Sequence, residues 1–269
     1  MTELPFATAR CRPLPAVLLL VAGFGVSLWL AGLAAAALPL GTWADPVGAL
    51  IPLATAAVLL WALGLLPQTL RPGRLGRGLL LGWYLPAAGA LVLALSALSW
   101  TAQGGGFSAP PLAALGAVLG QLGTAAIEEL FFRAGVLAVL AGALLGTGRM
   151  GPRGVVALSA AIFGLAHLLN LIHNPGALVP VLGQVVYAAL LGLLLGAVWL
   201  RTRSTGAVIL LHFLFNCGAA VGAMFDPEWS RHVLEAGEAD TSVGAAISTV
   251  VFAAPAGLIG WLLLSRRRT

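Results

Sequence analysis

Charge is scarce in this sequence. Charged residues make up 9% of the 269 residues, whereas a soluble domain has about 25%. Hydrophobic residues make up 60%, and the mean hydropathy is +1.01. This composition excludes a soluble globular protein and predicts a chain that is dissolved in lipid.

Lysine is missing altogether, and cysteine is rare. All 14 basic residues are arginines, and all of them except Arg133 lie outside the predicted spans, so the net charge of +5 indicates contact with anionic lipid headgroups and no nucleic-acid partner. Of the two cysteines, Cys11 is predicted to be cytoplasmic and Cys217 lies inside an apolar run. A structural disulfide is therefore not expected.

Long apolar runs, by contrast, are abundant. A helix needs about 20 mainly apolar residues to cross a bilayer, and eight such runs are separated by short loops. They predict an all-α, polytopic integral membrane protein that forms a single transmembrane domain over residues 1–269. The predicted spans are about residues 16–38, 47–66, 78–99, 112–145, 154–171, 178–200, 206–225 and 243–264.

The arginines predict the orientation, because positively charged loops stay on the cytoplasmic side. With eight spans, all arginines except Arg133 and Arg231 fall on one side, whereas most acidic residues fall on the other. We therefore expect a multi-pass protein of the cell membrane with both termini in the cytoplasm. The arginines on the predicted cytoplasmic side are Arg10, Arg12, Arg71, Arg74, Arg77, Arg149, Arg153, Arg201, Arg203, Arg266, Arg267 and Arg268.

The fourth run is longer than a membrane is thick. At about 1.5 Å per residue, a helix over residues 112–145 measures about 50 Å, against about 30 Å for the hydrocarbon core. Two crossings would move Arg149 and Arg153 to the outer side. We therefore expect one crossing that is tilted, broken near Gly120 or Gly123, or extended into the cytoplasm.

Only three of the predicted spans contain a charged residue or a histidine. An arginine or aspartate at membrane depth costs at least about 2.5 to 3.5 kcal/mol, so the default interpretation of such residues is functional. The alternative for each is a structural role in an ion pair or an interhelical hydrogen bond. The residues are Glu128, Glu129, Arg133, His167 and His212, with Asn216 as a polar companion.

The two adjacent glutamates differ in their expected partners. Glu129 and Arg133 are four residues apart and share a helical face, so they are expected to pair and to support the structure. Glu128 points about 100° away from that face and has no local partner. An unpaired carboxylate in an apolar site suits a general base.

The histidines show the same spacing. Phe163 and His167 are four residues apart, so the phenyl ring can fix the position of the imidazole. His212 and Asn216 are also one turn apart, and together they can hold a developing oxyanion. Alternatively, Glu128, His167 and His212 supply the carboxylate and two imidazoles of a catalytic zinc site.

The segments EELFFR, FGLAH and HFLFN match, in order and spacing, the EExxxR, FxxxH and HxxxN signatures of a known family. The chain resembles the CPBP intramembrane endopeptidases, which include type 2 CAAX prenyl proteases and Abi-like bacteriocin-processing and immunity proteins. The resemblance covers about residues 121–217, the core that carries the three motifs. It implies a helical membrane fold with a catalytic cavity inside the bilayer.

The resemblance also implies residue roles. Glu128 and His167 match the residues thought to activate water, and His212 and Asn216 match those that stabilise the oxyanion. Glu129 and Arg133 match the remaining positions of the first motif, in a supporting role. Zinc or another divalent metal at Glu128, His167 and His212 stays open. The implied substrates are membrane-associated peptides of the prenylated or bacteriocin type, which enter from the membrane or the cytoplasmic side.

Other functions are less consistent with the sequence. The HExxH, GxSG and GxGD signatures of other membrane peptidases are absent. A transporter also places carboxylates and histidines at depth, but it predicts discontinuous helices in paired halves, which are not found. An immunity protein that keeps the fold and acts through a partner is the remaining alternative.

Overall fold

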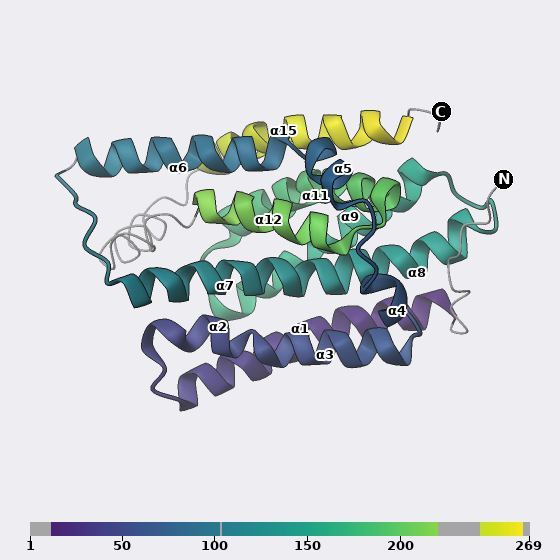
Figure 1. Cartoon of the computed structure of the whole chain (residues 1–269), viewed down its shortest axis with the longest axis horizontal. Helices are drawn as coiled ribbons and strands as arrows, with labels where there is room; N and C mark the ends of the chain where they lie inside the picture. Colours follow the sequence, from purple (N-terminus) through teal and green to yellow (C-terminus); the bar gives the residue numbers. More distant parts are fainter. Residues whose placement is uncertain (1–11, 103, 220–242, 266–269) are drawn as a thin grey trace.

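The structure, a computed structural model, describes residues 12–102, 104–219 and 243–265. Within these ranges every regular element is a helix, which confirms the all-α prediction. The helices run side by side along the long axis of the molecule (Figure 1). In chain order they are α1 (Pro13–Ala37), η1 (Gly41–Trp43), α2 (Ala44–Gly48), α3 (Leu50–Ala62), α4 (Leu66–Thr69), α5 (Leu75–Leu81), α6 (Tyr84–Ala102), α7 (Pro111–Glu129), η2 (Leu130–Leu137), α8 (Ala138–Leu140), η3 (Ala141–Leu145), α9 (Pro152–Ala166), η4 (His167–Leu169), α10 (Asn170–His173), α11 (Leu178–Thr202), α12 (Thr205–Ala219) and α15 (Val243–Ser265).

Six helices in the described part of the chain are long and apolar enough to cross a membrane. They carry large apolar side chains on the outside of the bundle, such as Trp61 and Leu258, as lipid contact requires. The protein is therefore a multi-pass membrane protein. The six segments are Pro13–Ala37, Ala44–Ala62, Tyr84–Ala102, Pro152–Ile172, Leu178–Thr202 and Ala246–Ser265.

Two predicted spans are not among these six. The run over residues 112–145 contains three charged side chains, which lower its hydropathy, and the run that starts at residue 206 forms a shorter apolar helix, Thr205–Gly218. Residues 220–225 of the latter prediction lie outside the described part. Both runs carry motif residues, and these polar groups lower the mean hydropathy by which a membrane span is recognised. The total of eight spans stays a prediction.

The third predicted span is wrong as a single helix. The chain forms α5, turns at Gly82 and Trp83, and then starts α6 at Tyr84. Pro86 lacks a backbone N–H group and fits the first turn of a new helix. Gly82 packs directly against Leu211 of α12, where an added Cβ would clash with the leucine side chain.

The long fourth run is helical from Pro111 to Leu145 without a break at Gly120 or Gly123, so that alternative is wrong. The two glycines instead admit a neighbouring segment, because Gly120 faces Asp45 and Gly123 faces Ala49. The irregularity comes later, where η2 and η3 are π-helical. Such wide turns often mark functional sites in helices, and η2 begins directly after Glu129.

Two of the arginine-rich loops lie together. The backbone N–H of Arg74 donates to the carbonyl of Thr202 at 2.9 Å, and Ser204 Oγ donates to the carbonyl of Pro72 at 2.8 Å. The start of α1 and the end of α15 also lie at the same end of the bundle (Figure 1). This arrangement agrees with an even number of crossings, and the cytoplasmic assignment of that end stays a prediction.

Close helix packing positions α12 between α6 and α7. Gly89 of α6 and Gly218 of α12 meet backbone to backbone, where a Cβ on Gly218 would overlap Gly89. On the other side, Gly164 of α9 lies against the carbonyl of Val185 in α11. These contacts allow the polar residues of four helices to face one another.

Candidate active site

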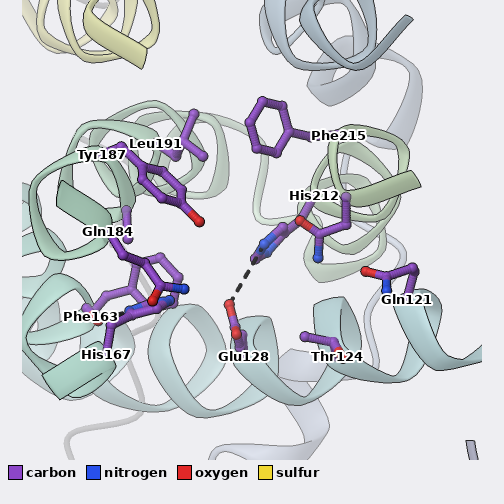
Figure 2. A pocket seen from close by; sticks show the side chains of 12 residues that line it. Gln121, Thr124, Glu128, Phe163, His167, Gln184, Tyr187, Leu191, His212 and Phe215 are labelled. Atoms are coloured by element: carbon purple, nitrogen blue, oxygen red, sulfur yellow. Dashed lines mark hydrogen bonds and ion pairs between the residues drawn. The ribbon is translucent and has the colours of Figure 1, made fainter. Parts of the chain in front are cut away.

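A cavity of about 270 Å³ lies where α7, α9, α11 and α12 meet. Figure 2 shows its lining side chains pointing toward a common centre. All four residues predicted to be catalytic line this cavity, although they come from three different helices. The lining residues are Gln121, Thr124, Glu128, Phe163, His167, Gln184, Tyr187, Ala188, Leu191, His212, Phe215 and Asn216.

The two glutamates diverge at the end of α7, as their helical positions predict. The Glu128 side chain is 15% exposed and lines the cavity, whereas the Glu129 side chain is 0% exposed and lies outside it. Gln121 and Thr124 precede Glu128 on the same helical face and also line the cavity. Glu128 is thus the carboxylate that a substrate in the cavity meets.

Glu129 joins two helices. Its Oε1 atom lies 3.0 Å from Arg133 Nη1, which is the predicted ion pair, and 2.8 Å from His212 Nδ1. Because a carboxylate accepts hydrogen bonds, the His212 Nδ1–H group is the donor. The contact with His212 was not predicted, since it crosses from α7 to α12. Glu129 therefore orients the imidazole in addition to compensating Arg133.

Arg133 is held by contacts on both of its sides. Its side chain is 2% exposed, and its guanidinium carbon lies 4.2 Å from the centre of the Phe163 ring. This cation–π contact adds to the ion pair with Glu129. Apart from that ion pair, the Nη1 and Nη2 atoms have no hydrogen-bond partner among the described residues. Arg133 therefore depends on the charge of Glu129.

His212 lies between the two glutamates. Its Nδ1 atom donates to Glu129, and its Nε2 atom lies 3.6 Å from Glu128 Oε2 (Figure 2). A ring that donates from Nδ1 donates from Nε2 as well only when it carries both protons. In that form His212 presents an N–H group to the cavity, and Asn216 follows one turn later on α12.

His167 presents a hydrogen-bond acceptor to the cavity, whereas His212 presents a donor. α9 ends at Ala166, and the tighter turn η4 starts with His167. Its Nδ1–H group donates to the carbonyl of Phe163 at 3.0 Å, so the neutral ring has its lone pair on Nε2. The Phe163 ring contacts the imidazole edge to face, with the ring centroids 5.0 Å apart, as the four-residue spacing predicts. His167 is thus prepared to accept a proton or a hydrogen bond.

The expected metal ligands do not assemble into a metal site here. Within residues 12–102, 104–219 and 243–265, no group of three His, Cys, Asp or Glu side chains is placed to hold a metal ion. Glu128, His167 and His212 line the same cavity, but they do not form such a group.

Three polar residues near the site were missed or given another role. Gln184 and Tyr187 line the cavity from α11, a helix that carries none of the three motifs. Their only signal in the sequence is that two polar residues three apart interrupt an apolar run. Asn170, three residues after His167, donates to Gln184 Oε1 at 2.8 Å and ties α10 to α11.

The fold and the cavity together define a multi-pass helical membrane protein with a polar site enclosed by its helices. Residues 109–218 match the family model described as type II CAAX prenyl endopeptidase Rce1-like. This segment runs from just before α7 through most of α12 and includes every residue of the three motifs. The segment is similar to the CPBP family of CAAX-type proteases, and this likeness supports an intramembrane endopeptidase of this general type. No curated protein and no solved structure matched the chain.

Proposed function

We propose that the protein hydrolyses peptide bonds of membrane-associated substrates in the cavity, with water activated by Glu128 and His167. The observation that carries this proposal is the complementary polarity of the site. Two acceptors, the Glu128 carboxylate and His167 Nε2, line the same cavity as the donors of His212 and Asn216.

The first step is the attack of water on the scissile carbonyl carbon. Glu128 removes one proton from the water while the water oxygen forms the new bond to carbon. The second hydrogen stays on the water oxygen and donates a hydrogen bond to His167 Nε2, which aligns the molecule. Glu128 has no ion-pair partner on its own helix, and its distance of 3.6 Å from His212 Nε2 is longer than a hydrogen bond, so its carboxylate is available as the base. The π electrons of the carbonyl move onto its oxygen, which becomes an oxyanion.

The second step returns the proton. His212, doubly protonated, donates from Nδ1 to Glu129 and from Nε2 to the oxyanion, and the Asn216 amide supplies a further N–H donor. As the oxyanion collapses, the carbon–nitrogen bond breaks and Glu128 gives its proton to the leaving amine. Glu128 is thereby regenerated, and Glu129 acts throughout as a positioning residue for His212.

The proposed substrates are peptides of the prenylated or bacteriocin type that reach the cavity from the membrane or from the cytoplasmic side. Support comes from the family of the matched segment and from the location of the cavity within the helix bundle. An apolar attachment would hold such a peptide in the lipid next to the enzyme.

The test is a proteolysis assay in liposomes with a peptide library that includes lipid-modified and unmodified members. Wild-type protein is compared with Glu128→Ala and with the isosteric Glu128→Gln, at equal protein level. We expect cleavage by the wild type and a loss of at least about 10³-fold in both variants, because neither side chain can accept a proton from water. Equal cleavage by wild type and Glu128→Gln would refute the mechanism, and a wild type that cleaves no peptide would favour the immunity or partner-binding alternative.

A further inference from the structure

α11 contributes a hydroxyl group to the cavity that the three motifs do not account for. Tyr187 lies across the cavity from Glu128, and its hydroxyl points into the space near Glu128 and His212 (Figure 2). The ring is partly buried and packs against the apolar core of the bundle. A substrate carbonyl in the cavity therefore meets this O–H group.

The surroundings of Tyr187 favour donation into the cavity. Gln184, one turn earlier on the same face of α11, receives a hydrogen bond from Asn170 on its Oε1 atom at 2.8 Å. Its carbonyl oxygen is thus engaged, and the amide hydrogens are what Gln184 offers toward the cavity. The Glu128 carboxylate lines the same cavity and is one acceptor for the phenol hydrogen, and an oxygen of a bound substrate is another.

Tyr187 also differs chemically from the other donors of the site. His212 must carry two protons to donate from Nε2, whereas a phenol donates in its ordinary neutral form. A neutral donor next to a developing negative charge stabilises it without a proton transfer of its own. Backbone N–H groups and tyrosine hydroxyls act in this way in other oxyanion sites.

We propose that Tyr187 is a further catalytic residue, which donates a hydrogen bond from its hydroxyl to the scissile carbonyl oxygen as that oxygen becomes an oxyanion. The hydrogen stays on the tyrosine oxygen; the bond that forms joins the water oxygen to carbon, and the electron pair moves from the carbonyl π bond onto oxygen. This inference rests on the proposed peptide hydrolysis in the same cavity.

The chain contains only two tyrosines, which gives a matched control. Tyr84, on α6, donates its hydroxyl hydrogen to the carbonyl of Phe252 in α15 and does not line the cavity. Tyr187→Phe and Tyr84→Phe remove the same atom from two helices of one bundle. We expect Tyr187→Phe to lower kcat by about 10²-fold with KM changed less than about threefold, and Tyr84→Phe to keep kcat near the wild-type value.

A second measurement separates catalysis from structure. In a Tyr84→Phe background Tyr187 is the only tyrosine, so biosynthetic incorporation of fluorotyrosines alters that hydroxyl alone. We expect kcat to change progressively with the acidity of the phenol at constant KM, since the donor strength changes while the side-chain shape stays nearly the same. A structural role predicts no such trend.

The outcomes are distinct. A Tyr187→Phe variant with kcat within threefold of wild type, or a kcat that is indifferent to fluorination, overturns the role of Tyr187. If Glu128→Gln is inactive in the same assay, only this inference fails and the proposed hydrolysis stands. If Glu128→Gln cleaves at the wild-type rate, the proposed function fails whatever Tyr187→Phe does. A Tyr187→Phe protein that is too unstable to assay leaves the decision to the fluorotyrosine series.

Discussion

Two adjacent glutamates with different surroundings should respond in opposite ways to the same substitution. Glu128→Gln removes a charge that lines a cavity and has no ion pair on its own helix, so we expect a stable but inactive protein. Glu129→Gln removes a fully buried charge that compensates Arg133 at 3.0 Å and orients His212 at 2.8 Å. We expect this variant to lose both stability and activity.

The expected loss of stability follows from the geometry of the pair. Two unit charges 3.0 Å apart interact by about 5 kcal/mol at an effective dielectric constant of about 20. Removing one partner of a buried pair costs about 3 to 5 kcal/mol, because the other charge stays buried without compensation. Arg133 is 2% exposed, so it cannot turn to solvent instead. The melting temperature of Glu129→Gln should fall by about 6 °C or more.

The assay measures melting temperature and peptidase rate for both variants in one detergent. A double variant, Glu129→Gln with Arg133→Met, separates the two functions of Glu129. Removal of both charges should restore most of the stability, because an apolar side chain replaces the stranded guanidinium. Activity should stay at least about 10²-fold below wild type, since the amide is a weaker acceptor for His212 Nδ1–H than a carboxylate.

Two results would refute this reasoning. If Glu129→Gln is the stable and inactive variant while Glu128→Gln unfolds, the roles of the two glutamates are exchanged. If the double variant recovers wild-type activity, the contact between Glu129 and His212 has no part in catalysis.

Three further predictions concern the metal, the packing and the orientation. A chelator tests the zinc alternative at Glu128, His167 and His212: if the mechanism proposed above holds, in which Glu128 and His167 alone activate the water, the peptidase rate stays within about twofold, and a loss that added zinc reverses supports the zinc site. Gly164→Ala should destabilise the protein by about 1 to 3 kcal/mol and lower its activity, since the added Cβ would lie 2.5 Å from the Val185 carbonyl oxygen. Gly76→Ala is the control, because nothing lies within 4 Å of its added Cβ. Equal melting temperatures of the two variants would contradict the prediction. Single cysteines at Gly104 and at Arg74 should be labelled in intact cells only at Gly104, and labelling at Arg74 would reverse the predicted orientation.

The sequence predicted those parts of the site that depend on local spacing. Glu129 and Arg133 share a face, Phe163 contacts His167, and Glu128 points away from its neighbour, because each relation is fixed within one or two helical turns. The apolar runs likewise predicted the all-α fold. The convergence of the three motif helices came from the resemblance and from the depth of their polar groups.

The parts that could not be predicted depend on tertiary packing. The bond between Glu129 and His212 joins residues 83 positions apart, and no spacing rule relates them. Tyr187 carries no motif, and only the rotation of α11 in the bundle turns its hydroxyl to the cavity. From the sequence alone, Gly120 and Gly123 are equally consistent with a break in the helix and with close packing of another helix; the position of the segment around Asp45 and Ala49 decides for packing. The charges of the fourth run lowered the hydropathy of the helix that holds Glu128, the proposed general base.

The hydrogen bond between Glu129 and His212 also has a consequence for biosynthesis. The ribosome completes α7 well before α12, and until α12 inserts next to it, Arg133 has its ion pair but Glu128 has no oxyanion donor across from it. If Glu128 is the general base proposed above, the half-made protein holds it in the membrane without a complete site. The proposed hydrolysis then requires the docking of α12, so a chain that stops short of α12, or whose α12 fails to pack against Gly89 of α6, is expected to lack protease activity.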